Sequence, residues 1–292
     1  MKKDSERNAW LFLVPFLALF ALVLIVPILY SLYISMFETT LVQGTNFIGI
    51  QNYLRLLDDA KFWEAAIRVV LFTAIQVPVM LAAAVGIALA LDSRRLHGMG
   101  FLRMFIFLPY AIPAIVSTLM WGFMMGVRWG LLREFNEFTG MNIDLFRPPF
   151  TMVAIGLIIL WGMTGYNVLI FYSSLKAVPG ELYEAAELDG ANQWKVVRYV
   201  KLPALRGTLA ITLIFSIIGT FQLFNEPLIL PDVVSNSGIT NNYTPNIYVY
   251  QLAFTGSQQG YAAAVALVMA LITIVFAYTV QLTSMRNLLR RR

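Results

Sequence analysis

The sequence predicts an all-α membrane protein with six transmembrane helices and a short helix–turn–helix between the fourth and the fifth. Two observations indicate this fold class. Of the 292 residues, 59% are hydrophobic and only 13% are charged, about half the charged share of a soluble domain. The apolar residues also gather into six almost charge-free stretches, each near the length of about 20 residues that crosses a bilayer as a helix.

These six stretches define the expected transmembrane helices. Helices are expected rather than strands, because backbone groups in lipid must pair within their own segment and barrel strands would show short alternating patterns. The boundaries are residues 9–36, 69–91, 104–127, 150–175, 207–226 and 258–284. With residues 1–8 as a cytoplasmic N-terminus, the chain from residue 9 to residue 292 forms a single transmembrane domain.

The first stretch begins like a secretory signal peptide, because Lys2, Lys3 and Arg7 precede it. Its apolar run exceeds the roughly 7–15 residues of a signal peptide, and no small-residue cleavage site follows at residues 30–35. We therefore expect a retained helix.

The basic residues are distributed unevenly over the loops between these helices. Six crossings place both termini on one side, and if that side is the cytoplasm, fifteen of the 21 Lys and Arg residues lie inside, as the positive-inside rule requires. The inner residues are Lys2, Lys3, Arg7, Arg94, Arg95, Arg103, Lys176, Lys195, Arg198, Lys201, Arg206, Arg286, Arg290, Arg291 and Arg292. Both termini are therefore predicted to be cytoplasmic.

The longest inner loop, residues 176–206, is the most polar long segment of the chain. Residues 181–189 combine helix formers with acidic residues in the first turn, which suits the positive end of a helix dipole. Gly190 is a natural stop, since glycine adopts the left-handed conformation that ends helices. Residues 191–201 can form a second short helix, and Pro203 is expected to prevent its continuation into the fifth span.

Two interpretations of this hairpin remain open on composition. It could lie on the membrane surface as an amphipathic pair of helices. Its acidic residues would be repelled by anionic lipid, however, and the small side chains of Ala185 and Ala186 suit the close approach of another protein. Composition alone therefore favours docking to a partner without excluding the membrane surface.

The hairpin sequence resembles the EAA loop of bacterial ABC-importer permeases. Glu184, Ala185 and Ala186 are followed by Gly190 and then by Leu202 and Pro203, and the longer string LYEAAELDGANQWKVVRYVKLP is similar to the carbohydrate-uptake branch, of maltose and glycerol-phosphate type. Three further segments resemble that branch in the same order: FIGIQNYLRLLDDAKFWEAA at 47–66, LPYAIPAIVSTLMWGFM at 108–124 and FQLFNEPLIL at 221–230.

The resemblance implies a coupling role for the loop at residues 176–206. In such importers its first helix sits in a cleft of a cytoplasmic ATPase, and closure of the ATPase pair moves the membrane helices. The residues that match this coupling motif are Glu184, Ala185, Ala186, Gly190, Leu202 and Pro203. Glu184 could accept a charge-assisted hydrogen bond from a basic group of the partner.

The same resemblance implies the partners: a second homologous permease, two cytoplasmic ATPases, an extracellular solute-binding lipoprotein and a sugar substrate, at the bacterial cytoplasmic membrane. The chain has no G-x-x-x-x-G-K-[ST] phosphate loop, so ATP and Mg²⁺ are expected on the ATPase and no cofactor on this chain. It has no cysteine and one histidine, His97, expected to be a solvated loop residue. A net charge of +5 does not indicate nucleic acid.

Polar side chains inside the spans are candidates for a substrate path, since polar groups in membrane helices usually face a bundle interior. The candidates are Tyr166, Asn167, Ser216, Thr220, Gln222 and Asn225, with Tyr110 in the third span. Aromatic faces, amides and hydroxyls suit sugars. By resemblance, Tyr166 and Ser216 match positions that line the sugar site of maltose-type permeases, whereas a threonine such as Thr220 can simply bond its own helix.

Two other classes of protein are possible. A self-contained secondary carrier for a small polar solute would need ionisable groups deep in the membrane, and Glu226 is the nearest such residue. A membrane enzyme would need a catalytic constellation, which the sequence does not show. If the chain belongs to an importer, the loop at 237–254 resembles that of permeases for di- or oligosaccharides, while polyols and glycerol phosphate remain possible substrates.

Overall fold

The computed structural model of the protein describes residues 2–40, 44–93, 99–127, 129–234 and 237–289. Within these residues the structure is almost entirely helical, with one two-stranded sheet. The chain folds as two compact units, Met1–Glu64 with Pro245–Leu271 and Ala65–Thr244 with Ile272–Arg292. Two long helices, α4 (Ala60–Leu91) and α15 (Gln259–Leu289), contribute residues to both.

The first unit starts with a long apolar helical segment and a small hairpin. Besides parts of α4 and α15, its elements are α1 (Lys2–Phe20), the π-helical turn η1 (Ala21–Ile25), α2 (Val26–Ile34), β1 (Phe37–Thr40), β2 (Gly44–Phe47), α3 (Gln51–Leu57), α14 (Pro245–Tyr250) and the π-helical turn η3 (Gln251–Thr255). The strands are antiparallel, with Phe37 opposite Phe47.

The contacts around the β1–β2 hairpin explain why this unit is compact. The buried Asn52 amide donates hydrogen bonds of 2.8 and 3.1 Å to the carbonyl oxygens of Ser35 and Phe37. Gly260, near the start of α15, lies so close that a Cβ there would be 2.0 Å from the Phe37 carbonyl oxygen. A side chain larger than hydrogen at position 260 would therefore force the two segments apart.

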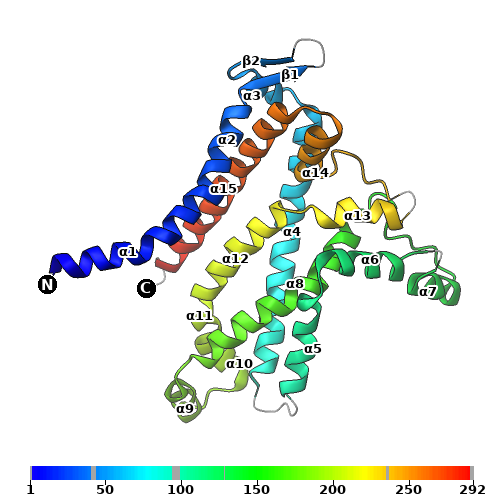
Figure 1. Cartoon of the computed structure of the whole chain (residues 1–292). Helices are drawn as coiled ribbons and strands as arrows, with labels where there is room; N and C mark the ends of the chain where they lie inside the picture. The colour runs from blue at the N-terminus through cyan, green and yellow to red at the C-terminus, as the bar shows by residue number, and fades with distance from the viewer. Residues whose placement is uncertain (1, 41–43, 94–98, 128, 235–236, 290–292) are drawn as a thin grey trace. The chain divides into compact units, whose positions relative to one another are not determined.

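The second unit contains most of the helices. Besides parts of α4 and α15, it holds α5 (Met99–Ala111), α6 (Ala114–Met124), α7 (Leu131–Thr139), α8 (Thr151–Lys176), α9 (Gly180–Leu188), α10 (Gln193–Val196), the π-helical turn η2 (Val197–Lys201), α11 (Leu202–Ala204), α12 (Arg206–Phe221) and α13 (Asn225–Val233). Figure 1 shows α5 beside α8, and α6 beside α13.

Glycines and buried polar groups set these helix contacts. A Cβ at Gly165 of α8 would lie 2.0 Å from the Ile106 carbonyl oxygen of α5, so only glycine allows this approach. The Gln76 amide of α4 donates 2.9 Å to the Gly156 carbonyl oxygen of α8. The apolar core around these contacts includes Phe72, Phe146, Ala154, Ile155, Ile158 and Leu230.

Four of the six predicted spans are single long helical segments. The described residues contain four helices long and apolar enough to cross a membrane, and six if each of two bent pairs counts as one span. The four are Phe12–Ile34, Ala60–Leu91, Thr151–Lys176 and Gln259–Leu282, which cover the predicted first, second, fourth and sixth spans.

The predicted third span is bent by 98° between α5 and α6. Pro113 precedes α6 with an extended ψ of 139°. The residue before a proline is pushed out of the helical region, and the proline ring cannot follow a preceding helical turn. The single span expected over 104–127 therefore consists of two helices.

The predicted fifth span, residues 207–226, is also interrupted. Helix α12 ends at Phe221, and α13 starts at Asn225. Pro227 explains the new start, because a proline lacks the N–H that a helix interior needs and is tolerated in the first turn. The polar residues predicted near the end of this span thus lie at a helix break.

Candidate functional site

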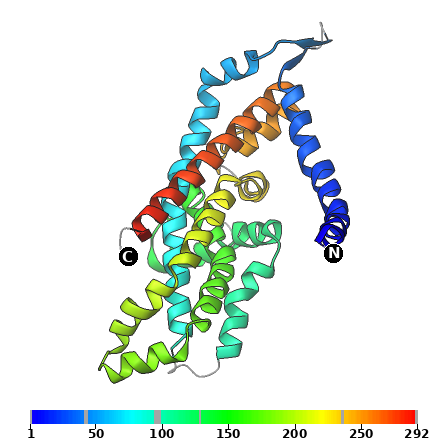
Figure 2. The same ribbon diagram turned by 90° about the vertical axis from the view of Figure 1, so that its left-hand side faces the viewer.

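The hairpin predicted at residues 176–206 is present as two helical segments joined by a tight turn. Figure 2 shows α9 running away from the end of α8 and the chain turning back toward α12. Gly190 has a φ of +69°. Its N–H bonds the Glu187 carbonyl at 3.1 Å, and the Ala191 N–H bonds the Ala186 carbonyl at 2.9 Å. This is a Schellman ending, so the predicted role of Gly190 as the stop of the first helix is confirmed.

The second segment of the hairpin is longer than predicted. The Asn192 side chain caps its start, accepting 2.9 Å from the Lys195 N–H, and helical structure continues from Gln193 to Ala204. The segment does not continue straight into the fifth span, as expected from Pro203, because a 60° bend before α12 follows Ala204. A π-helical turn directly precedes α11, and such turns loosen the hydrogen-bond ladder that a proline would otherwise disrupt.

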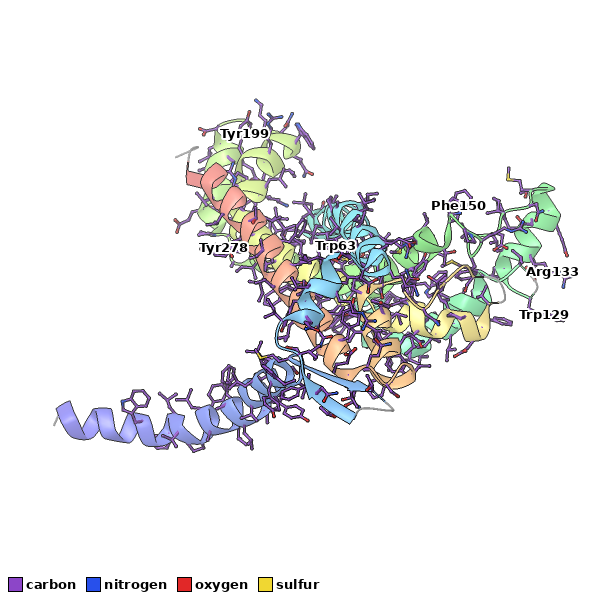
Figure 3. All side chains as sticks on the ribbon, turned by 90° about the horizontal axis from the view of Figure 1, so that it is seen from above. Trp63, Trp129, Arg133, Phe150, Tyr199 and Tyr278 are labelled. Carbon is purple, nitrogen blue, oxygen red and sulfur yellow. The ribbon has the colours of Figure 1, made fainter. Side chains whose placement is uncertain are left out.

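The residues of the predicted coupling motif lie at or near the surface. Glu184 and Ala185 are exposed, while Ala186, Leu202 and Pro203 are half-buried. Large apolar side chains are exposed beside them: Leu188 is 90%, Trp194 67% and Tyr199 69% exposed, and Tyr199 is labelled in Figure 3. Sequence analysis did not single out these three, although Trp194 and Tyr199 are the aromatic residues of a stretch that also carries Lys195, Arg198 and Lys201.

An ion cluster joins the hairpin to the ends of α4 and α8. Asp92, directly after α4, accepts from Lys201 Nζ at 2.7 Å and from Lys176 Nζ at 2.9 Å. The side chains of Asp92 and Lys201 are 7% and 10% exposed, and that of Lys176 is 54% exposed. Sequence analysis counted both lysines only as topology signals, because Asp92 is distant in the chain.

A cavity of about 340 Å³ lies behind α9, toward the ends of α4 and α8. Its lining includes Leu89, Leu175, Tyr183, Glu187, Val197 and Lys201. The Lys201 ammonium is 5.8 Å from the centre of the Tyr183 ring. Helix α9 is therefore not packed flat against the helices beside it.

Two aromatic candidates for the substrate path come together. Tyr166 of α8 and Tyr110 of α5 stack with ring centroids 4.9 Å apart and planes at 24°, and they are 38% and 40% exposed. Gln222 and Asn225 are exposed at the break between α12 and α13, and Ser216 is half-buried. Stacked tyrosines can contact the C–H faces of a sugar, and exposed amides can contact its hydroxyls.

Thr220 and Asn167 are buried and bonded within the protein. The Thr73 hydroxyl of α4 donates 3.0 Å to that of Thr220, which itself bonds the carbonyls of Ser216 and Ile217. Asn167 is 4% exposed, and its amide donates to the Met163 carbonyl of the same helix. These bonds account for both side chains structurally. His97 lies outside the described residues.

A second cavity, of about 630 Å³, lies among α5, α6 and α8. Its lining is mainly apolar and includes Trp121 and Trp161, whose rings meet edge to face at 5.6 Å. None of the six predicted path residues lines it. Among the residues that the structure describes, no group of three or more His, Cys, Asp or Glu side chains could hold a metal ion.

Comparison with known proteins gives consistent matches. The family model described as "Binding-protein-dependent transport system inner membrane component" matches residues 82–286. The diacetylchitobiose uptake system permease protein of Streptomyces coelicolor is 32% identical over 255 residues, 82% of this chain and 71% of that protein. The lactose transport system permease protein of Rhizobium radiobacter is 32% identical over 284 residues, 95% of this chain and 94% of that protein.

A solved structure has the same fold. A chain of a bacterial ABC transporter involved in alginate import superposes with a TM-score of 0.82 at 18% identity, covering 97% of this chain and 98% of that one. The family match extends over most of the chain, including the hairpin, the bent third span from α5 to α6 and the helix break after α12. The chain therefore belongs to the family of binding-protein-dependent transport system inner membrane components.

Proposed function

We propose that the chain is the membrane-spanning permease subunit of an ATP-driven importer that moves a di- or oligosaccharide into the bacterial cytoplasm by alternating access. The hairpin is the observation that carries the proposal. It presents Glu184 and Ala185 at its surface, ends its first helix at Gly190 and returns directly into α12. An exposed hairpin that leads directly into α12 suits a partner that moves the membrane helices as rigid bodies.

The relatives support the choice of substrate class. Besides diacetylchitobiose and lactose, the names of similar permeases include trehalose/maltose and arabinooligosaccharides. The stacked pair of Tyr110 and Tyr166 and the exposed amides of Gln222 and Asn225 belong to the same unit and supply the aromatic and amide groups that an uncharged sugar needs. Ser216 completes the proposed path.

The proposal includes the assembly and the topology. Helices α5 and α6 together make one span and α12 makes another, which with the four long helices gives six crossings with both termini in the cytoplasm and the hairpin beside them. A second homologous permease forms the other wall of the path, two cytoplasmic ATPases bind ATP and Mg²⁺, and an extracellular solute-binding lipoprotein delivers the sugar. This chain carries no cofactor and catalyses no reaction of its own.

Reconstitution in liposomes tests the proposal. The cognate solute-binding protein is first screened against a sugar panel, and its preferred sugar is labelled. We expect uptake only when the chain is reconstituted with its partner permease and ATPases, and only with ATP on the ATPase side. Sugar transport by this chain alone, driven by a proton or sodium gradient, would overturn the proposal and establish a secondary carrier.

A further inference from the structure

We propose that the buried ion pair between Asp92 and Lys201 is the link through which movement of the hairpin reaches α4, so that Lys201 is a positioning residue of the transport cycle. The inference rests on the proposed function, because it presumes that an ATPase moves the hairpin. It concerns a pair of residues that lie behind the docking surface, at the point where the hairpin meets the membrane helices.

The position of Asp92 explains why its carboxylate is paired with two lysines. Asp92 follows the last residue of α4, where the carbonyl groups give the helix a partial negative charge. A carboxylate is unfavourable there, and its 7% exposure leaves little solvation by water. The ammonium groups of Lys201 and Lys176, at 2.7 and 2.9 Å, offset both effects.

The two lysines connect different parts of the unit. Lys201 ends η2, which is continuous with the second segment of the hairpin, and its side chain is 10% exposed. Lys176 ends α8, and its side chain is 54% exposed. The bond of Lys201 therefore joins the hairpin to α4, whereas the bond of Lys176 joins two membrane helices and is partly screened by water.

The cavity behind α9 limits the other routes for a movement. A cavity of about 340 Å³ lies between α9 and the ends of α4 and α8. A displacement of α9 therefore reaches the membrane helices mainly along the chain, through α11 and the buried Leu205 into α12. The Asp92–Lys201 pair adds a direct connection to α4. A short ion pair shielded from water resists stretching more than an exposed one, so both helices would move with the hairpin.

The test compares Lys201→Met with Lys176→Met in the complete transporter in liposomes, measuring sugar taken up per ATP hydrolysed. We expect Lys201→Met to keep ATPase binding and ATP hydrolysis but to lower this ratio about tenfold or more. Lys176→Met, the matched control, should stay within about twofold of the wild type. Lys201→Arg, which retains the charge, should recover most of the ratio.

Several results would overturn the link. They are a wild-type ratio in Lys201→Met, equal losses in both lysine variants, and loss of the ATPase from the purified Lys201→Met complex, which would make Lys201 a docking residue. Asp92→Asn breaks the same bond from the other side, together with the bond of Lys176, and should give the same low ratio. Lys201→Gln, which removes the charge but keeps a polar side chain, decides the matter if Lys201→Met does not assemble. Absence of ATP-driven uptake by the wild type would instead refute the proposed function.

Discussion

Asp59 and Asp92 lie at opposite ends of α4, and their surroundings differ. Asp59 precedes the helix and accepts hydrogen bonds from neutral donors: the hydroxyls of Tyr248 and Tyr261, at 2.6 and 2.5 Å, and the backbone N–H groups of Lys61 and Phe62. Asp92 follows the helix and is held by two ammonium groups. The same side chain is thus stabilised by dipoles at one end and by charges at the other.

The helix dipole explains the difference. At the N-terminus of α4 the unpaired N–H groups favour a carboxylate, and neutral donors are sufficient. Burial by itself would raise the pKa of Asp59, but the hydrogen bonds from Tyr248, Tyr261, Phe62 and Lys61 outweigh it, and the pKa lies below its ordinary value. At the C-terminus the dipole opposes a carboxylate, so Asp92 requires cations.

The two clusters consequently have different roles. All partners of Asp59 belong to the first unit, where α14 and the start of α15 meet the N-terminus of α4, and Arg55 covers the Tyr261 ring at 3.9 Å. One partner of Asp92 belongs to the proposed moving hairpin. We interpret the Asp59 cluster as a fixed anchor and the Asp92 cluster as a link between parts that move together.

The largest effect on stability is expected for Asp92→Asn. The substitution leaves the Lys201 ammonium buried without its counter-charge, and breaking a buried ion pair costs about 3–5 kcal/mol. Denaturant unfolding in detergent should show this loss, whereas Asp232→Asn, at an exposed position, should stay near the wild type. A loss for Asp92→Asn no greater than that of Asp232→Asn would contradict the account.

A smaller loss is expected for Asp59→Ala. This variant loses the cap of α4 and the acceptor of two tyrosine hydroxyls, together about 2–3 kcal/mol. The neighbouring Asp58→Ala is the control, since Asp58 is exposed. If Asp59→Ala proved more destabilising than Asp92→Asn in the same assay, the contrast between dipolar and ionic stabilisation would be wrong.

The smallest effect on stability is expected when the pH is lowered. Because the folded-state pKa of Asp59 is lower than its unfolded-state value of about 3.9, the cluster stabilises the protein above that pH and loses this contribution as the pH falls further. The difference in melting temperature between the wild type and Asp59→Asn should therefore shrink from pH 6 to pH 3. A difference that grows toward pH 3 would reverse the sign and refute the assignment.

Sequence reasoning found the features that depend on local composition. Apolar runs mark the four long membrane helices, and Gly190 marks the end of α9, because lipid solvation and backbone conformation act within one segment. Pro113 is a visible signal for a bend before α6, but the sequence does not give its size of 98°. Whether a proline bends a membrane helix slightly or breaks it depends on the helices that pack around it.

The two aspartate clusters could not be predicted in the same way. An aspartate before a helix start is a recognisable cap signal, and it was available for Asp59. Its partners Tyr248 and Tyr261, however, are 189 and 202 residues away. The bond between Asp92 and Lys201 likewise depends on how α4 meets the hairpin, which no local pattern records. The alternative stated for Thr220, a hydroxyl that bonds its own helix, is confirmed, whereas the burial of Asn167 was not predicted.

The central claim is that a separate ATPase binds the hairpin, and Glu184→Lys tests it most directly. This variant reverses the charge at an exposed position of α9, with Glu134→Lys on the exposed face of α7 as the control. The measurement is ATP-driven sugar uptake together with co-purification of the ATPase. We expect Glu184→Lys to insert into the membrane normally but to lose both the ATPase and the uptake; uptake at the wild-type rate with the ATPase still bound would contradict the claim.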